Sequence, residues 1–339
     1  MRILGAGGAG VIGSNFIRYI LGAHDDWRVV NVDKLTYAGN LANLSDVAED
    51  PRYRFHRADI CDGGEIAGIF AKEKPESVVN FAAESHVDRS IDDPALFLRT
   101  NILGTQVLLD AARKNGVARY LQISTDEVYG SLGATGKFSE ESPLRPNSPY
   151  AASKTSADLL VRAYGKTFGL PVLVTRCSNN YGPYQFPEKI IPFFVTLLRE
   201  GKQVPVYGDG MNVRDWIHVE DHSRAVEAVL LRGRPGEIYN VGGGNERTNI
   251  EITKMLIAAM GKDESSMKFV PDRPGHDRRY AIDDAKIRGE LGVAPRVPFE
   301  EGLRATVRWY LENEPWWRAV QSGEYQSFYD RWYVRKDRA

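Results

Sequence analysis

Two neighbouring carboxylates follow a predicted buried strand in this 339-residue chain. Residues 119–123 (RYLQI) form the predicted strand, and Thr125, Asp126 and Glu127 come at its end in the stretch STDEVYG. Neighbouring side chains on a strand point to opposite faces, whereas at a turn both carboxylates could converge on one site. Two convergent carboxyl groups can supply an acid and a base to one substrate. The alternative, which the heptapeptide taken alone favours, is a solvated turn.

A tyrosine and a lysine lie one helical turn apart further along the chain. Tyr150 and Lys154 in SPYAASK are spaced i, i+4 on one face of a predicted helix, with Ser148 as its cap and Pro149 in its first turn. A nearby ammonium favours the phenolate, so the pair could take the proton of a hydroxyl group while a hydride leaves the same carbon. Lys154 could also hold a nicotinamide ribose. Many solvated helices carry such a pair, so its meaning depends on a cofactor site.

A glycine loop between the first predicted strand and the first predicted helix indicates such a site. Gly7, Gly10 and Gly13 form G-x-x-G-x-x-G, and glycine lets the backbone turn tightly and approach a pyrophosphate. Asp33 ends the second predicted strand about 20 residues later, where an acid binds the adenosine ribose and disfavours NADP. Asp59, at the end of the third predicted strand, is a candidate partner of the adenine edge. The alternative is a glycine-rich turn that binds nothing.

Short apolar strands alternate with helices through the first half of the chain. Strands are predicted at residues 2–6, 28–32, 52–59, 76–81, 119–124 and 171–176, and helices at 11–23, 63–73, 94–116 and 148–169. This alternation indicates βαβ units and a Rossmann-type, doubly wound parallel sheet. From about Cys177 the chain is rich in loops, with further helices predicted at 249–261 and 299–313. We therefore expect an α/β fold with a smaller α+β region that caps the sheet.

The composition excludes several classes of protein. Lys plus Arg number 44 and Asp plus Glu 45, a net charge of −1, which argues against general binding of nucleic acid or anionic membranes. No apolar run reaches the length of a membrane span. Two cysteines, Cys61 and Cys177, are too few for a disulfide framework, and the opening MRILGAGGAG leads into a strand rather than a signal peptide. We expect a soluble, cytoplasmic protein.

Longer motifs carry a family resemblance that spans nearly the whole chain. The glycine loop, FAAES (81–85), Thr125 and Tyr-x-x-x-Lys are similar to extended short-chain dehydrogenases/reductases that act on nucleotide sugars. The chain resembles dTDP-glucose 4,6-dehydratases in DKLTYAGN (33–40), AAESHVDRSI (82–91), STDEVYG, RCSNNYGPYQFPEK (176–189), GDGMNVRDWIHVEDH (208–222), GHDRRYAID (275–283) and SGEYQ (322–326). The resemblance implies NAD-dependent loss of water from dTDP-glucose to give dTDP-4-keto-6-deoxyglucose for deoxysugars such as rhamnose. It also implies a homodimer, formed through the helices that begin near Pro94 and Ser148.

The resemblance assigns catalytic roles to the residues that opened this section. Tyr150 would take the proton of the C4 hydroxyl as a hydride moves from C4 to NAD, with Thr125 sharing the hydrogen bond. Glu127 would be the base at C5 and Asp126 the acid at C6, and the hydride would then return to C6. A dehydration needs an acid and a base at adjacent carbons, so this interpretation of Asp126 and Glu127 displaces the solvated turn.

The resemblance also implies the two binding sites. NAD would contact Gly7, Gly10, Val11, Ile12, Gly13, Asp33, Lys34, Leu35, Thr36, Asp59, Ile60, Phe81, Ala82, Ala83, Ser85, Thr100, Tyr150, Lys154 and Asn180. The sugar nucleotide would contact Ser85, Thr125, Asn179, Lys189, Ile190, Pro205, Tyr207, Arg214, Asn249, Arg279, Tyr280 and Asp283. Lys189 and Arg214 would suit a diphosphate, although most Lys and Arg side chains are surface cations. Residues 1–178, with later segments around 211–243, would bind NAD, and 179–339 mainly the sugar nucleotide.

Two other patterns have simpler explanations. His218 and His222 are spaced i, i+4, but we expect Asp221 to cap a helix that begins near His222, and no third ligand is evident, so no metal site is predicted. The aromatic stretch at residues 314–333 more often indicates core or interface than a ligand site.

Alternatives remain at the level of sequence. A 4-epimerase or a UDP-glucuronate decarboxylase needs the Tyr/Lys pair but no acid/base pair, and an NAD-binding protein that has lost catalysis needs neither. The family usually has Val-Thr-Gly-Gly and a later Phe where this chain has Gly5-Ala6-Gly7-Gly8 and Val11. Ala6 lacks a hydroxyl that could fix the loop, so we expect weaker retention of NAD than in a typical relative.

Overall fold

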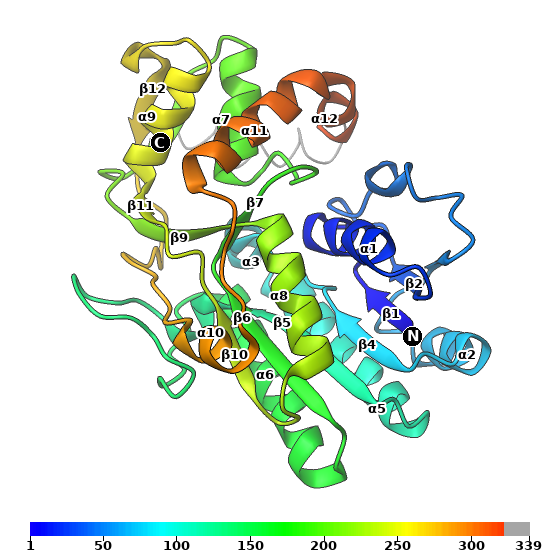
Figure 1. Cartoon of the computed structure of the whole chain (residues 1–339). Coiled ribbons are helices and arrows are strands. Elements are labelled where there is room, and N and C mark those ends of the chain that lie inside the picture. Colours follow the sequence, from blue (N-terminus) through cyan, green and yellow to red (C-terminus); the bar gives the residue numbers. More distant parts are fainter. Residues whose placement is uncertain (322–339) are drawn as a thin grey trace.

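A seven-stranded parallel sheet is the centre of the protein (Figure 1). The structure is a computed structural model that describes residues 1–321. The strands run in the order β10-β6-β5-β4-β1-β2-β3. Their bounds are β1 Arg2–Ala6, β2 Arg28–Asp33, β3 Tyr53–Arg57, β4 Ser77–Asn80, β5 Arg119–Thr125, β6 Val172–Cys177 and β10 Ile238–Val241. The prediction of a Rossmann-type α/β fold is confirmed.

The strand register places the candidate site at one edge of this sheet. Ala6 at the end of β1 lies opposite Val32 and Asn80, and Thr125 at the end of β5 lies opposite Cys177. Strand order reverses at β1, which pairs with β2 on one side and β4 on the other. In open α/β sheets, ligands bind at the carboxyl ends of the strands beside such a reversal.

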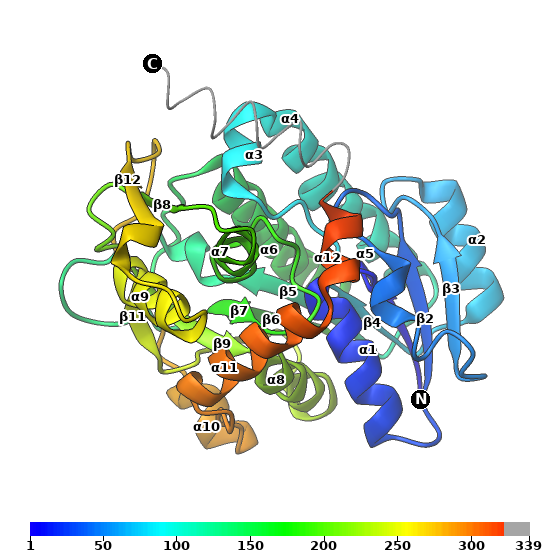
Figure 2. The same ribbon diagram turned by 90° about the horizontal axis from the view of Figure 1, so that it is seen from above.

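Helices cover both faces of the sheet, as Figures 1 and 2 show. On one face lie α1 (Val11–Ala23) and α8 (Val219–Arg232), whose apolar side chains share a core with β2 and β5. On the other face lie α2 (Gly63–Glu73), α5 (Thr105–Lys114) and α6 (Pro149–Phe168). Because both faces are buried, the strands consist of nearly continuous apolar runs, which made them recognisable in the sequence.

The long helix predicted at residues 94–116 is not a continuous α-helix. It consists of α4 (Pro94–Phe97), a π-helical segment (Leu98–Gly104) and α5. Within the π-helical segment the Asn101 amide donates to the Glu84 carbonyl (3.0 Å) and to Ser153 Oγ (2.8 Å). Wide π turns occur mostly at functional sites, and this one places Thr100 in the lining of the cavity described below.

The second half of the chain forms a smaller α+β region with its own core. Two small sheets have the strand orders β11-β9-β7 and β12-β8. Its elements are β7 (Asn179–Tyr181), α7 (Ile190–Arg199), β8 (Val204–Tyr207), β9 (Val213–His218), β11 (Glu246–Thr248), α9 (Asn249–Ala259), β12 (Met267–Val270), α11 (Phe299–Glu312) and α12 (Glu314–Val320). Two further helices lie outside this core: α10 (Ala285–Leu291) packs in the core of the large sheet, and α3 (Val87–Asp92) precedes α4 in the first half of the chain. Apolar side chains of α7, α9, α11 and α12 pack together, with Trp317 fully buried among them.

The aromatic stretch is partly explained by this core. Trp316 Nε1 donates to Asn43 Oδ1 (2.9 Å), and its ring lies edge-on to Tyr184. The expectation of a core or interface role therefore holds for residues 314–321, while residues 322–333 and the SGEYQ motif lie outside the described residues. Within residues 1–321, the helices are too short or too polar to cross a membrane.

Close packing at the glycine loop generates a stability prediction. A Cβ atom on Gly13 would lie 2.4 Å from the Gly7 carbonyl oxygen, whereas one on Gly22 of the same helix would meet nothing within 4 Å. We expect Gly13→Ala to lower the free energy of unfolding by about 1–3 kcal/mol, because the backbone must move. Gly22→Ala, the matched control, should be neutral or stabilising by up to about 1 kcal/mol. Urea unfolding measures both, and equal effects would contradict this account of the loop.

Candidate active site

A cavity at the carboxyl ends of β1, β2, β4 and β5 collects the residues expected to bind NAD. Those expected residues all line it except Leu35, which is not among the described lining residues. Gly7 has φ +79°, and a Cβ there would lie 2.5 Å from the Ala82 amide nitrogen. Glycine is therefore required both for the turn and for the close approach of the two chain segments.

Asp33 organises the segment that follows β2. Its carboxylate accepts hydrogen bonds from the Ala9 amide (2.9 Å) and the Leu35 amide (2.8 Å). Burial raises the pKa of Asp33, and these two hydrogen bonds oppose that rise. Leu35 thus acts through its backbone, at φ +58°. Lys34 pairs with Asp59 at 2.7 Å. The open glycine cradle, the helix N-terminus behind it and the acceptor on Asp33 fit a dinucleotide.

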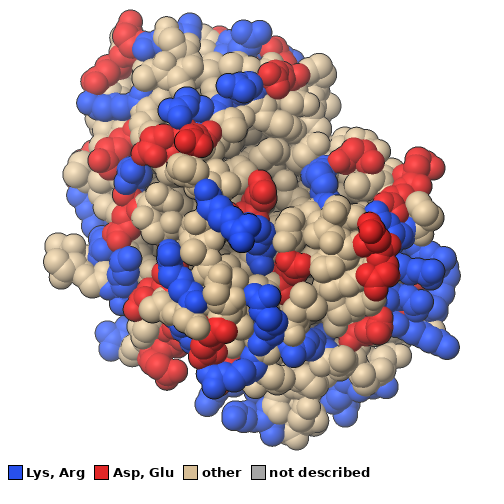
Figure 3. Space-filling model, viewed as in Figure 1, with Lys and Arg blue, Asp and Glu red and all other residues tan. Residues whose placement is uncertain are grey.

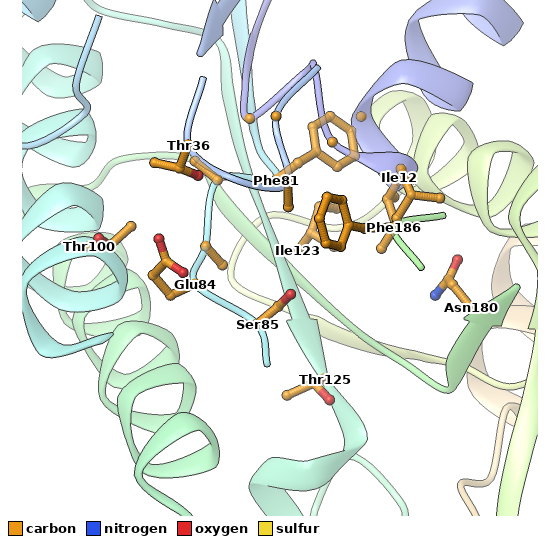
Figure 4. A pocket seen from close by; sticks show the side chains of 18 of the residues that line it. Ile12, Thr36, Phe81, Glu84, Ser85, Thr100, Ile123, Thr125, Asn180 and Phe186 are labelled. Atoms are coloured by element: carbon orange, nitrogen blue, oxygen red, sulfur yellow. The ribbon is translucent and has the colours of Figure 1, made fainter. Parts of the chain in front are cut away.

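Figure 4 shows this cavity from close by. In that view Thr36, Thr100, Glu84 and Ser85 lie on one side, and Ile12, Phe186 and Asn180 on the other. Several lining residues were not singled out from the sequence: Val32, Ala38, Gly39, Ala58, Glu84, Ile123, Ser124, Cys177, Ser178, Gln185, Phe186 and Glu188. Glu84 and Glu188 lie inside quoted motifs, so the motifs marked the right segments without indicating which side chains enter the cavity.

The two carboxylates that open the STDEVYG turn are withdrawn from solvent. β5 ends at Thr125, and Asp126–Tyr129 form a 3₁₀ turn. Thr125 Oγ1 accepts from the Glu127 amide (3.3 Å), and the Thr125 hydroxyl donates to Asp126 Oδ1 (3.4 Å). Asp126 is only 1% exposed, which excludes the solvated turn. Both carboxylates line the cavity.

The surroundings separate the acidities of the two carboxyl groups. Burial raises the pKa of Asp126 well above its usual value, and the neighbouring charges of Glu127 and Asp215 raise it further. Its Oδ2 is buried without a hydrogen-bond partner in the described structure. Burial also raises the pKa of Glu127, but Arg273, Arg214 and Lys189 oppose that rise. Asp126 is thus the better acid donor in this pair, since it retains its proton more readily, and Glu127 is the better base.

Tyr150 and Lys154 reach the same cavity from the first turns of α6. Ser148 caps this helix by accepting from the Ala151 amide (3.1 Å), with Pro149 in the first turn, as predicted. Burial and the Glu127 charge raise the pKa of Tyr150, while a hydrogen bond from Thr125 lowers it. Lys154 Nζ donates to the Ile123 carbonyl oxygen (2.7 Å). Burial lowers the pKa of Lys154, and the nearby Asp158 carboxylate raises it.

A second cavity adjoins the first and collects most of the residues expected to bind the sugar nucleotide. Glu127, Asn179, Glu188 and Lys189 line both cavities. The expected residues Ile190, Pro205, Tyr207, Arg214, Asn249 and Tyr280 line the second one, whereas Ser85 and Thr125 line the first. A substrate in the second cavity would therefore meet Glu127 at the junction with the cofactor.

Arg273 is a lining residue that the sequence analysis missed. Its guanidinium donates to Asp88 Oδ1 (3.0 Å), and its buried Nε has no partner in the described structure. Together with Lys189 and Arg214 it gives the second cavity three cations. Arg273 lies two residues before the GHDRRYAID motif, in the turn PDRPG. A basic residue in a turn beside a matched motif was the available signal.

Arg279 and Asp283 are not brought into either cavity, judged by the described lining residues. The Arg279 guanidinium instead binds Glu246 Oε2 (2.7 Å) and the carbonyls of Gly133 and Gly136 (3.3 and 3.0 Å). Asp283 is exposed and accepts from the Ala285 amide (2.9 Å) at the start of α10. The structure thus gives both residues local roles in holding loops, in contrast to the expected substrate contacts.

His218 and His222 have separate local partners, the Glu220 amide and Asn180 Oδ1. His218 itself caps α8 by accepting from the Glu220 amide, so the prediction that Asp221 is the cap is wrong. Asp221 lies inside the helix and accepts from the amides of Arg296 and Val297 (both 3.0 Å). Within the described residues, no three His, Cys, Asp or Glu side chains are grouped to hold a metal ion.

Comparisons with known proteins agree with this geometry. The family model described as GDP-mannose 4,6 dehydratase matches residues 4–306. The chain is 54% identical to a dTDP-glucose 4,6-dehydratase from an Actinoplanes species, over 94% of this chain and 100% of the relative. It is similar to the crystal structure of a Streptomyces venezuelae dTDP-glucose 4,6-dehydratase with NAD and dTDP bound, with TM-score 0.92, 54% identity, and 94% and 100% coverage of this chain and that chain. A Thermotoga maritima UDP-glucose 4-epimerase matches less well, with TM-score 0.86, 32% identity, and coverage of 93% and 100%.

The raised pKa of Asp126 predicts how stability depends on pH. The folded state binds this proton more tightly than the unfolded state, so stability falls as pH rises from about 4, the ordinary carboxyl pKa, toward the folded-state pKa. Asp126→Asn cannot ionise. Its free energy of unfolding should therefore gain on that of the wild type as pH rises, and Glu127→Gln should show a smaller effect of the same sign. Urea unfolding across this range tests the prediction, and a difference that shrinks with pH would show that Asp126 is ionised in the fold.

Proposed function

The chain belongs to the dTDP-glucose 4,6-dehydratase family and converts dTDP-glucose to dTDP-4-keto-6-deoxyglucose and water with NAD as cofactor, and we propose that Thr125, Asp126, Glu127, Tyr150 and Lys154 carry the chemistry. The observation that carries this proposal is the pair of adjacent carboxyl groups in different surroundings. Asp126 is buried and, among residues 1–321, the rise in its pKa is opposed by the charge of Arg214 alone, whereas three cations lower the pKa of Glu127. An elimination of water needs one group that holds a proton and one that accepts a proton.

Tyr150 removes the proton of the C4 hydroxyl in this proposal. Bound NAD supplies a hydride acceptor at C4, a hydride donor at C6 and a positive charge that favours the phenolate. The Thr125 hydroxyl, which donates to Asp126 Oδ1 in the structure, would turn to the Tyr150 oxygen, where its hydrogen bond lowers the pKa of Tyr150 and favours the phenolate. Lys154, anchored on the Ile123 carbonyl, has two further N–H donors for a cofactor hydroxyl.

Glu127 and Asp126 act on the ketone that follows. A ketone at C4 acidifies the C5 proton, which Glu127 removes, while the Asp126 carboxyl protonates the departing C6 hydroxyl so that it leaves as water. Glu127 then exchanges its proton with solvent and protonates C5 as the hydride returns to C6. The turn geometry makes this division feasible, since the 3₁₀ turn after Thr125 directs both neighbouring side chains to one cavity.

Lys189, Arg214 and Arg273 hold the diphosphate in this proposal. Three cations in one cavity match the charge of a nucleotide diphosphate, and the two guanidinium groups can bind its oxygens in pairs. Arg214 also lies over the Tyr280 ring, at 4.3 Å from its centroid, which limits the freedom of the Arg214 side chain before substrate binds.

We further propose that residues 1–178 with parts of 211–243 form the NAD-binding unit, supported by the pairing of β10 with β6, and that 179–339 mainly binds the sugar nucleotide.

Mass spectrometry of the product tests the reaction. With dTDP-glucose the pure protein should form a product lighter by one water, without net NADH, and deuterium at C4 of the substrate should appear at C6. In D₂O the product should carry deuterium at C5. Asp126→Asn, Glu127→Gln and Tyr150→Phe should each lower kcat by about 100–10,000-fold, while Glu141→Gln, an exposed control, should not. An unchanged mass with an altered configuration at C4 would instead favour the 4-epimerase.

We propose a cytoplasmic location, which is supported by the free cysteines Cys61 and Cys177.

We also propose that the protein is a homodimer. Figure 3 shows that positive and negative side chains are interspersed over the face drawn there, so no single-sign patch marks that face. Large apolar side chains are instead exposed on the helices beginning at Pro94 and Pro149. They are Leu96, Leu98, Leu103, Leu159 and Phe168. Such a surface suits a self-complementary interface.

Charged substitutions on these helices should dissociate the dimer. Leu103 and Leu159 are 57% and 50% exposed, so Leu103→Glu and Leu159→Glu should fold normally in the monomer. Because each change occurs twice in a two-fold interface, we expect the dimer dissociation constant to rise about 100-fold or more. Sedimentation velocity measures this change. Leu231→Glu on α8, at 39% exposure, is the control; an equal effect there, or none at Leu103 and Leu159, would contradict the proposed interface.

A further inference from the structure

Two irregular segments meet across the cofactor cavity. The first, residues 34–40, follows β2 and contributes Lys34, Thr36, Ala38 and Gly39 to the lining. The second, residues 182–189, follows β7 and contributes Gln185, Phe186, Glu188 and Lys189. The second segment also belongs to the lining of the adjoining cavity through Glu188 and Lys189. Any bond between the two segments therefore bears on access to the cofactor.

A group of three residues, Tyr37, Glu188 and Arg89, joins the two segments. The Tyr37 hydroxyl donates to Glu188 Oε1 (3.0 Å), and Arg89 Nε donates to Glu188 Oε2 (3.3 Å). The Arg89 guanidinium also lies 3.8 Å from the centroid of the Tyr37 ring, and Phe186 packs edge-on against that ring at 5.3 Å. We name this group the Tyr37–Glu188–Arg89 latch. It joins the first segment to the second and both to α3.

The burial of Glu188 strengthens the hydrogen bonds of the latch. Glu188 is only 8% exposed, so its charge is stabilised by the two donors rather than by water. Hydrogen bonds to an ionised group are about twice as strong as neutral ones, and losing one in a buried setting leaves the charge undercompensated. Burial and the Glu188 charge raise the pKa of Tyr37 well above its usual value, which keeps its hydroxyl a donor.

Hydrogen bonds from two helices hold the second segment, residues 182–189, in place. Asn15 of α1 donates to the Pro183 carbonyl (3.1 Å), and the Tyr310 hydroxyl of α11 donates to the Gln185 carbonyl. The Gln185 amide in turn donates to the Asn180 carbonyl (2.9 Å). The segment to which Tyr37 is hydrogen-bonded is therefore held both by α1, which covers the sheet, and by α11 of the smaller region.

We propose that Glu188 is a positioning residue and that the Tyr37–Glu188–Arg89 latch keeps NAD in its cavity from one turnover to the next. The inference rests on NAD binding in the first cavity. The reaction returns its hydride to the substrate, so NAD never needs to leave, whereas the sugar nucleotide must exchange in every cycle. A latch on the cofactor side would hold NAD while the sugar nucleotide exchanges. The latch residues are distinct from Gly5 and Ala6, the altered residues of the glycine loop.

Tyr37→Phe tests the latch, because it removes one hydroxyl and keeps the ring beneath Arg89. Tyr37 is not among the described residues that line either cavity, so the variant leaves the binding surfaces intact. The matched control is Tyr19→Phe, whose hydroxyl donates to Glu227 Oε2 (2.6 Å) between α1 and α8. Each protein is loaded with radiolabelled NAD, chased with excess unlabelled NAD, and followed by filter binding.

Release of NAD should be about tenfold faster from Tyr37→Phe than from the wild type and unchanged in Tyr19→Phe. At saturating added NAD, kcat should stay close to that of the wild type. Glu188→Gln, which keeps the shape of the side chain but removes the charge and replaces one acceptor oxygen with an N–H donor, should release NAD faster as well and serves if Tyr37→Phe does not fold. Unchanged release from a folded Tyr37→Phe, or equal acceleration in Tyr19→Phe, overturns the latch while leaving the dehydratase function intact. Failure of the wild type to bind NAD overturns the inference together with its premise.

Discussion

The proposed chemistry depends on placing two adjacent carboxyl groups in surroundings that separate their pKa values. Burial alone would raise the pKa of both Asp126 and Glu127 and leave them alike. They differ because three cations, Arg273, Arg214 and Lys189, oppose the rise in the pKa of Glu127, whereas at Asp126 Arg214 is the only cation of the described residues that opposes burial and the charges of Glu127 and Asp215. These cations come from three separate segments of the smaller region. The proposed acid/base pair that follows β5 is therefore complete only when the second half of the chain has folded against the first.

The proposed catalytic groups lie on or beside elements with several supporting contacts. β5 lies between β4 and β6 in the sheet, and α6 begins with a side-chain cap at Ser148. Ser153 on α6 and Asn101 on the π-helical segment are joined by a hydrogen bond of 2.8 Å. A desolvated carboxyl group gains its altered acidity only if its neighbours cannot move to solvate it. Rigid supports are thus part of the pKa control as well as of the geometry.

The sequence predicted the features that depend on local pattern. Strand ends, the glycine loop, the Asp33 position and the capped helix carrying Tyr150 all follow from periodicity and spacing over short stretches. The features that it did not predict depend on distant segments meeting. Arg273 enters the second cavity from an irregular turn, and Glu84 enters the first from a motif whose backbone alone could be anticipated. The expected role of Arg279 as a substrate contact failed for the same reason. Its guanidinium binds Glu246 and the Gly136 carbonyl of a distant loop instead.

The two ligands of such an enzyme impose opposite demands on one surface. A recycled cofactor favours a closed cavity, whereas a substrate consumed in each cycle needs an open one. Glu188 and Lys189 lie at the junction and line both cavities. Glu188 directs its carboxylate to Tyr37 and Arg89, while Lys189 donates to the Ser85 carbonyl (2.8 Å). Glu188 lies in a turn, and Lys189 is the N-cap of α7. In our proposal this one short stretch holds the cofactor side shut through Glu188 and presents the cation of Lys189 to the cavity that exchanges its substrate.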